Sequence, residues 1–151
     1  MSSQIVEPKP GVDVGRVVVP IVVQNVEDRE REERGEIPAD QVRTLKLDVL
    51  VDSGATFFCL PESRVKELGL RFDRVRETQT VTGPMKLNMY RGARIEVQGR
   101  PCNVEVMGLP KGRQALLGQI PLGTLDWWID VTNHRLVGNP EHGGQWMAEV
   151  F

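Results

Sequence analysis

Residues 44–51 place leucine or valine at every odd position, with mostly polar side chains between them. Because successive side chains of a strand point to opposite faces, this period of two predicts a β-strand with one buried face. Residues 16–24 form a second run rich in β-branched residues, which also predicts a strand. Pro20 interrupts that run and cannot donate a backbone hydrogen bond, so we expect an edge strand, a bulge or two short strands there.

Several further apolar segments are short and are separated by turn-forming residues. They predict strands at residues 57–60, 93–97, 102–107, 115–118, 127–131 and 135–137. Residues 74–90 carry apolar side chains spaced among polar ones, and Thr82, Gly83 and Pro84 interrupt them near the middle. This pattern predicts a β-hairpin with its tip at that tripeptide.

Helical patterns are confined to two short segments. Proline suits the first turn of a helix and glycine its carboxyl-terminal cap, so Pro61 and Gly69 predict a helix at residues 62–68. A second short helix is expected at residues 121–125. Many short strands with one or two short helices indicate an all-β fold, either a closed β-barrel or a sandwich.

The distribution of proline, glycine and charge divides the chain into three parts. Residues 1–15 are predicted to be a flexible amino-terminal arm, residues 16–137 a single domain, and residues 138–151 a tail without an assigned structure. Within the domain, residues 27–41 are expected to form a charged hairpin insertion. Its run of Glu and Arg side chains is interpreted as a solvated loop or a frayed helical turn.

Composition agrees with one globular domain and argues against two classes of partner. The chain has 151 residues, of which 40% are hydrophobic and 26% charged, and its formal net charge is −2. This balance gives no basic surface for nucleic acid, and no apolar run approaches the roughly 18 residues of a membrane-spanning helix. Because the amino terminus lacks a basic and apolar leader, we expect a soluble, cytoplasmic protein.

Cysteine and histidine are too few and too scattered for a metal site or a disulfide framework. Cys59 and Cys102 lack metal-ligand spacing and are expected to be reduced, partly buried thiols. His134 and His142 lie in polar, turn-like contexts and are expected at the surface. We therefore expect neither a metal nor a cofactor. The three tryptophans are expected to fill core or interface space.

The most informative chemistry lies where the strand at residues 44–51 ends. This strand runs directly into Asp52, Ser53 and Gly54. A carboxylate in apolar surroundings is costly unless it is paired or protonated, which favours a chemical role for Asp52. The same tripeptide is also an ordinary turn sequence, because Asp and Ser favour turns and Gly tolerates positive φ.

Other elements follow this tripeptide in a recognisable order. A hairpin with Gly83 near its tip is followed by Ala115-Leu116-Leu117-Gly118, and then by the sequence LDWWID at residues 125–130. Together with the Asp-Ser-Gly turn after an apolar strand, this order resembles the retroviral-type (retropepsin-like) aspartic proteases, and specifically their single-domain bacterial relatives. The resemblance covers roughly residues 16–137.

The resemblance implies three groups of site residues and no cofactor. The active-site loop, one per chain, would contain the catalytic residues Asp52, Ser53 and Gly54. An extended peptide or protein substrate would be bound by Ala55, Thr82 and Gly83. Structural support beneath the loop would come from Leu116, Leu117 and Gly118.

One Asp-Ser-Gly supplies only half of such a site. Hydrolysis by this route needs two neighbouring carboxylates that share one proton, because like charges so close together cannot both ionise. One activates water as a general base and the other protonates the carbonyl oxygen. No other Asp of the chain is followed by Ser or Thr and then Gly. The second carboxylate would therefore be Asp52 of another copy across a two-fold axis, which predicts a homodimer.

Other functions stay open at this point. The chain could be a non-catalytic retropepsin-like module for peptide binding or dimerisation, or a small β-barrel that binds an unrelated ligand. The complete Asp-Ser-Gly favours activity, because a retired site would be free to lose its carboxylate. A serine hydrolase is disfavoured, since Gly-x-Ser-x-Gly is absent. The leading prediction is a homodimeric aspartic endopeptidase.

Overall fold

The computed structural model describes residues 16–147. Its strands are β1 (Val18–Asn25), β2 (Thr44–Val51), β3 (Phe58–Pro61), β4 (Arg71–Thr80), β5 (Gly83–Val97), β6 (Arg100–Leu109), β7 (Leu116–Leu117), β8 (Trp127–Asp130) and β9 (Arg135–Gly138). Its helical segments are α1 (Val26–Glu33), η1 (Ala39–Gln41), α2 (Glu62–Leu68), α3 (Gln119–Leu125) and η2 (Pro140–His142). The predicted all-β class is confirmed.

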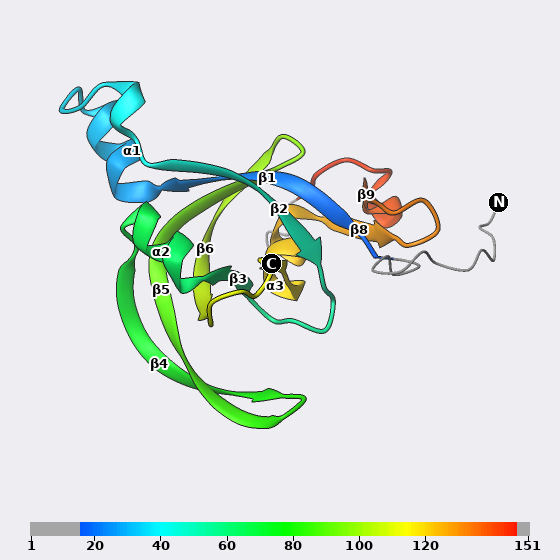
Figure 1. The fold of residues 1–151 in the computed structure, drawn as a ribbon. Coiled ribbons are helices and arrows are strands. Elements are labelled where there is room, and N and C mark those ends of the chain that lie inside the picture. The colour runs from blue at the N-terminus through cyan, green and yellow to red at the C-terminus, as the bar shows by residue number, and fades with distance from the viewer. Residues whose placement is uncertain (1–15, 148–151) are drawn as a thin grey trace.

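Seven of the strands form one sheet that partly closes on itself. The strand order is β1-β2-β7-β3-β6-β5-β4, and an additional pairing of β1 with β5 completes a ring. β4 lies outside the ring and pairs with β5 to form a long, curved hairpin, which Figure 1 shows extending from the body of the ring. β8 and β9 form a separate two-stranded sheet.

β1 passes through Pro20 without a break. Pro20 lies opposite Asp48 of β2, whereas pairing with β5 begins only at Ile21. The strand therefore has one neighbour at the residue that lacks a backbone donor, and two neighbours after it. The edge-strand interpretation is correct for residues 18–20, which precede the pairing with β5.

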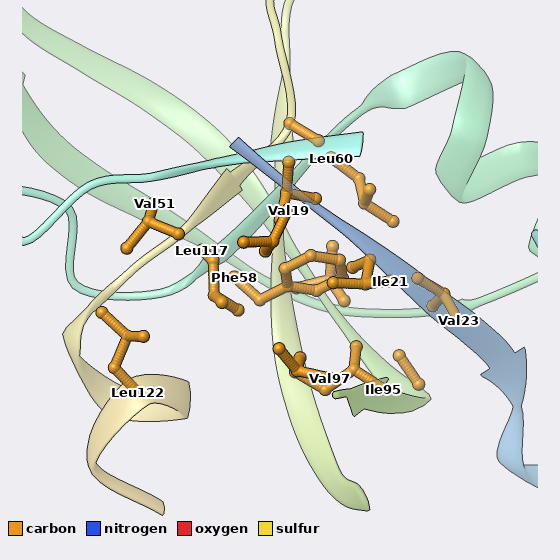
Figure 2. Close-up of a cluster of buried hydrophobic side chains, with 14 of the residues drawn as sticks. Val19, Ile21, Val23, Val51, Phe58, Leu60, Ile95, Val97, Leu117 and Leu122 are labelled. Atoms are coloured by element: carbon orange, nitrogen blue, oxygen red, sulfur yellow. The ribbon is translucent and has the colours of Figure 1, made fainter. Parts of the chain in front are cut away.

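The main hydrophobic core fills the interior of the ring. Figure 2 shows side chains from β1, β3, β5 and β7 meeting there. Val23, Phe58 and Leu117 are fully buried. Because burying one such side chain contributes roughly 1.5–3 kcal/mol, this cluster is the main source of the fold's stability.

A second, smaller core cluster lies on the other face of β3 and β7. Its buried members are Phe57, Cys59, Met89 and Met107, with Leu87, Leu109 and Leu116 packed against them. Strand residues alternate between faces, so Phe58 and Leu117 face the main core, whereas Cys59 and Leu116 face the second cluster. β3 and β7 are therefore covered by apolar side chains on both faces.

The turns are close to those predicted, with one displacement. α2 spans the predicted residues, and Gly69 ends it with a left-handed φ of 63°. The turn of the β4–β5 hairpin is formed by Val81 and Thr82, whereas Gly83 already pairs with Thr80 as the first residue of β5. The predicted tip is thus one residue too far along the chain.

The charged run after β1 forms helix α1 instead of a solvated loop or frayed turn. Asn25 caps the helix, because its side-chain oxygen accepts a hydrogen bond of 2.9 Å from the Asp28 backbone nitrogen. Asp28 is only 4% exposed. Its carboxylate accepts hydrogen bonds from the Arg43 guanidinium at 2.7 and 2.9 Å and from the Arg43 backbone nitrogen at 3.0 Å. The run is mostly exposed, as expected, but it is a capped helix with one buried carboxylate and not a loop or a frayed turn.

Residues 138–147 pack against the end of α3. Asp126 is buried, and its Oδ2 atom lies 2.6 Å from Nδ1 of His142. The guanidinium of Arg100 lies 3.8 Å over the Trp127 ring and donates to the Gly144 carbonyl oxygen at 2.8 Å. His142 is thus half-buried and not at the surface, although His134 is exposed as expected. Residues 1–15 and 148–151 of the predicted arm and tail lie outside the described residues.

Two further expectations concern the thiols and the membrane. Cys59 and Cys102 are free cysteines, and the first is buried, as expected. Among residues 16–147, no helix is long and apolar enough to cross a membrane.

The pair of Asp28 and Arg43 should make a pH-dependent contribution to stability. Hydrogen bonds from Arg43 hold the pKa of Asp28 below its usual value in the folded protein. A carboxyl group whose pKa is lower in the folded than in the unfolded protein stabilises the fold at pH values above its unfolded pKa. This stabilisation is lost as the pH falls through the folded-state pKa. We expect Asp28→Asn to lower the free energy of unfolding by about 1–2 kcal/mol at pH 7, measured by urea denaturation.

The control for this prediction is Glu33→Gln, on the same helix, whose side chain is exposed. Its stability at pH 7 should match that of the wild type. The difference between wild type and Asp28→Asn should begin to shrink as the pH falls below about 4, the usual pKa of an unfolded aspartate. It should disappear once the pH is below the lower pKa of the folded protein. Equal stability of Asp28→Asn and wild type at pH 7 would contradict the structural role of this pair.

Candidate active site

Asp52 lies one residue beyond the end of β2. β2 runs parallel to β7, with Val51 opposite Leu117. The ladder continues past the strand, because the Asp52 backbone nitrogen donates a hydrogen bond of 3.0 Å to the Leu117 carbonyl oxygen. The backbone of Asp52 is therefore fixed by the sheet before its side chain enters the loop at residues 52–57, which we call the Asp52 loop.

The Asp-Ser-Gly turn orients the carboxylate of Asp52. The Gly54 backbone nitrogen donates to Oδ1 of Asp52 at 2.8 Å, and the Ala55 backbone nitrogen donates to the Asp52 carbonyl oxygen at 3.1 Å. Within residues 16–147, neither Oδ2 of Asp52 nor the hydroxyl of Ser53 makes a hydrogen bond. One carboxylate oxygen is thus held in place, and the other remains available.

The first residues of α3 hold the Asp52 loop from the other side. The backbone nitrogens of Gln119 and Ile120 donate to the carbonyl oxygens of Ala55 and Thr56, each at 2.9 Å. The Gln119 side chain donates to the carbonyl oxygen of Ser53 at 2.6 Å. The first backbone donors of a helix have no partner within the helix, so here they bind loop carbonyls. The result is a loop held by β7 at its start and by α3 along its length.

Gly118 makes this close approach possible. A Cβ atom at position 118 would lie 2.5 Å from the Phe57 carbonyl oxygen and 2.7 Å from that of Ala55. Both contacts are with backbone atoms, which cannot rotate away. The φ of Gly118 is −93°, so the requirement is for space and not for a left-handed conformation.

Cys59 lies near Asp52 but is not suited to nucleophilic chemistry. Burial and, second, the negative charge of Asp52 raise the pKa of the Cys59 thiol to about 12. The thiol is therefore protonated at neutral pH, and a protonated thiol is a poor nucleophile. Among residues 16–147 there is also no cluster of three His, Cys, Asp or Glu side chains that could hold a metal ion. The carboxylate of Asp52, by contrast, keeps one oxygen without a hydrogen bond among residues 16–147.

A cavity of about 240 Å³ lies between the β4–β5 turn and β7. Thr82 from the turn and Leu116 from β7 both line it. Figure 1 shows the tip of this hairpin reaching the side of the molecule on which the β2–β3 loop lies. The cavity adjoins the Asp52 loop, because its lining residue Leu116 precedes Leu117, whose carbonyl oxygen accepts from the Asp52 backbone nitrogen.

The structure brings most of the predicted site residues together. Asp52, Ser53, Gly54 and Ala55 form the Asp52 loop, and the segment Leu116-Leu117-Gly118 supports it through the contacts described above. Thr82 lines the cavity, whereas Gly83 does not.

Sequence reasoning missed Gln119, whose side chain holds Ser53. Its position directly after Gly118 was the available signal, because the residues that follow the close approach must face the loop.

A ring of strands that presents one Asp-Ser-Gly loop, with a hairpin over the adjoining cavity, defines the retropepsin-like class of folds. A family model described as aspartyl protease matches residues 39–120, which include β2, the Asp52 loop, the hairpin and β7. The match covers more than half of the chain, so the protein belongs to the retropepsin-like aspartyl protease family. No curated protein matches the chain.

The close approach at Gly118 predicts that a single added methyl group destabilises the protein at this position but not at a nearby glycine of α3. Gly118→Ala should lower the free energy of unfolding by about 2–3 kcal/mol, because the added carbon overlaps two backbone carbonyls. The matched control is Gly123→Ala in the same helix, where a Cβ would meet nothing within 4 Å. That control should be stabilising by up to about 1 kcal/mol, because alanine favours a helix. Equal urea-denaturation midpoints for the two variants would refute the role of Gly118.

Proposed function

We propose that the protein is an aspartic endopeptidase whose active site contains two Asp52 carboxylates, one from each subunit of a homodimer. The observation that carries this proposal is the state of the Asp52 carboxylate. One oxygen is held by Gly54 at 2.8 Å, and the other is free of hydrogen bonds within residues 16–147. Membership of the aspartyl protease family supports the same chemistry.

In the proposed reaction, the two carboxylates share one proton. The ionised carboxylate takes a proton from a water molecule as the water oxygen bonds to the peptide carbonyl carbon. The protonated carboxylate gives its proton to the carbonyl oxygen, which forms a neutral diol. As the carbon–nitrogen bond breaks, the departing nitrogen takes the proton of one carboxyl group. One hydroxyl of the diol gives its proton to the other carboxylate, so the product is a carboxylic acid and the pair again shares one proton. No metal or cofactor takes part.

A two-fold axis beside Asp52 would bring specific exposed groups into contact. The hydroxyl of Ser53 is free to donate to the partner subunit. Ile120, which follows Gln119 on the loop side of α3, is 51% exposed. The indole nitrogen of Trp146 donates to the carbonyl oxygen of Thr124 at 3.1 Å. Thr124 lies one helical turn after Ile120, so the exposed Trp146 side chain is held near Ile120. These groups support a dimer surface that adjoins the Asp52 loop.

The proposed substrate is an extended segment of a peptide or protein, bound as an added strand between the Asp52 loop and the hairpin turn. Ala55, Thr82 and Gly83 are the proposed backbone contacts. A cytoplasmic location and kinship with single-domain bacterial members stay predictions.

The mechanism predicts that Asp52→Asn abolishes cleavage without unfolding the protein. Asparagine keeps the oxygen that accepts from Gly54 but cannot act as a general base, so kcat/KM should fall by about 10³-fold or more. The assay incubates wild type and variant with a denatured protein mixture from acidic to neutral pH. Cleavage by purified Asp52→Asn at the wild-type rate would refute the mechanism. A wild type that binds peptides and cleaves none would support the non-catalytic module instead.

The proposed dimer surface predicts that a charged substitution at Ile120 weakens the dimer. Ile120→Glu should shift the protein from dimer to monomer in sedimentation analysis and reduce cleavage in parallel, because a buried unpaired carboxylate is costly. The control is Val75→Glu on β4, which changes a side chain of similar exposure, 54%, away from the Asp52 loop. A wild type that cleaves substrate as a monomer would overturn the shared site.

A further inference from the structure

The cavity beside the Asp52 loop has an apolar wall. Its apolar lining includes Val81, Met85, Leu87, Leu109 and Leu116. All three leucines also pack against the second core cluster, so they are held in place by buried neighbours. The leucine part of the wall is therefore a fixed apolar surface, whereas Val81 and Met85 are exposed side chains of the hairpin.

Arg113 is the one charged residue among those that line this cavity. It lies in the loop between β6 and β7, where its backbone nitrogen donates to the Pro110 carbonyl oxygen at 3.3 Å. No carboxylate lines the cavity to neutralise it. Its neighbour Gln114 accepts a hydrogen bond from Arg16 and is an uncharged amide.

The guanidinium of Arg113 is not paired in the way that those of Arg71 and Arg74 on β4 are. Arg71 pairs with Glu27 at 2.8 Å, and Arg74 pairs with Glu105 at 2.7 Å. Arg113 has no ion pair or side-chain hydrogen bond within residues 16–147. A guanidinium is always charged and presents donors in a fork that fits the two oxygens of a carboxylate. Arg113 therefore offers an unused anion-binding group at the edge of an apolar cavity.

The cavity is close to the reacting atoms. Leu116 lies opposite Leu50 in the parallel ladder, two residues before Asp52, and Thr82 closes the other side. Asp52 itself does not line the cavity. A side chain entering it would thus belong to a substrate residue next to the bond that is cleaved, and not to the bond itself.

We infer that Arg113 makes the enzyme select an acidic side chain, glutamate above all, beside the scissile bond. The methylene groups of glutamate would lie along the leucine wall, and its carboxylate would reach the Arg113 guanidinium. Lysine and arginine would be rejected by like charge. This inference rests on the proposed function. Because a two-fold dimer has two such cavities, the preference should occur on both sides of the scissile bond.

The test uses capped peptides of one sequence that carry Glu, Gln, Leu or Lys at the positions flanking the cleaved bond. Blocked ends exclude binding through a terminal carboxylate. Wild type should cleave the Glu peptide about tenfold better than the Gln peptide in kcat/KM, as expected for one charge-assisted hydrogen-bonded contact. Arg113→Met should remove this preference, and Arg113→Glu should reverse it in favour of Lys.

The matched control is Lys111→Met, which removes a cation from the same loop that does not line the cavity. It should keep the wild-type preference for Glu. An active wild type without a Glu preference, or one whose preference survives in Arg113→Met, overturns the inference and leaves the proposed function intact.

If wild type cleaves no peptide, the proposed function fails. The binding of the same peptides to Asp52→Asn, followed by fluorescence anisotropy, then decides the role of Arg113. If Asp52→Asn binds the Glu peptide more tightly than the Gln peptide, and if adding Arg113→Met removes this difference, the role of Arg113 is supported. Equal binding of the two peptides would refute it.

Discussion

The loop that carries Asp52 depends on how closely β7 and α3 approach it. Backbone bonds from Gln119 and Ile120 to the loop carbonyls can form only if the chain passes within contact distance of Ala55 and Phe57. Gly118 is the residue at which this passage occurs, and any side chain there would overlap backbone oxygens. An exposed loop with its own turn would otherwise sample several conformations, at a cost in ordering its carboxylate.

The packing around β3 and β7 links this loop to the cavity. Because both strands are buried on two faces, Leu117 supports the main core while Leu116 supports the second cluster and the cavity wall. A shift of β7 would therefore change three features together, namely the start of the Asp52 loop, the core and the shape of the cavity. This coupling is a reason to regard the loop and the cavity as one site.

The parts of the fold that sequence reasoning missed share a physical cause. The helix α1 was hidden within a charged run, because its stability comes from the Asn25 cap and from Asp28 paired with Arg43, fifteen positions further along the chain. His142 was assigned to the surface for a similar reason. Its partner Asp126 comes from the end of α3, and nothing in the local sequence marks that contact. Hydrophobic periodicity indicates which face of a strand is buried, but it gives no information on polar pairs between distant segments.

The sequence by itself determined the all-β class, the helix at residues 62–68, the strand that leads into Asp52, and the order of motifs that indicates the family. The class, the helix and the strand follow from local rules, because alternation, proline and glycine restrict the backbone residue by residue. The family was indicated by resemblance, through the order of its motifs. Tertiary structure alone decided that Gln119 holds the Asp52 loop, that Leu116 and Thr82 face one cavity, and that Arg113 is the charge at its edge. Gln119 lies 66 positions from Ser53, and Leu116 lies 34 positions from Thr82. Only the closure of the ring, which pairs β1 with β5 and sets β7 between β2 and β3, brings them together.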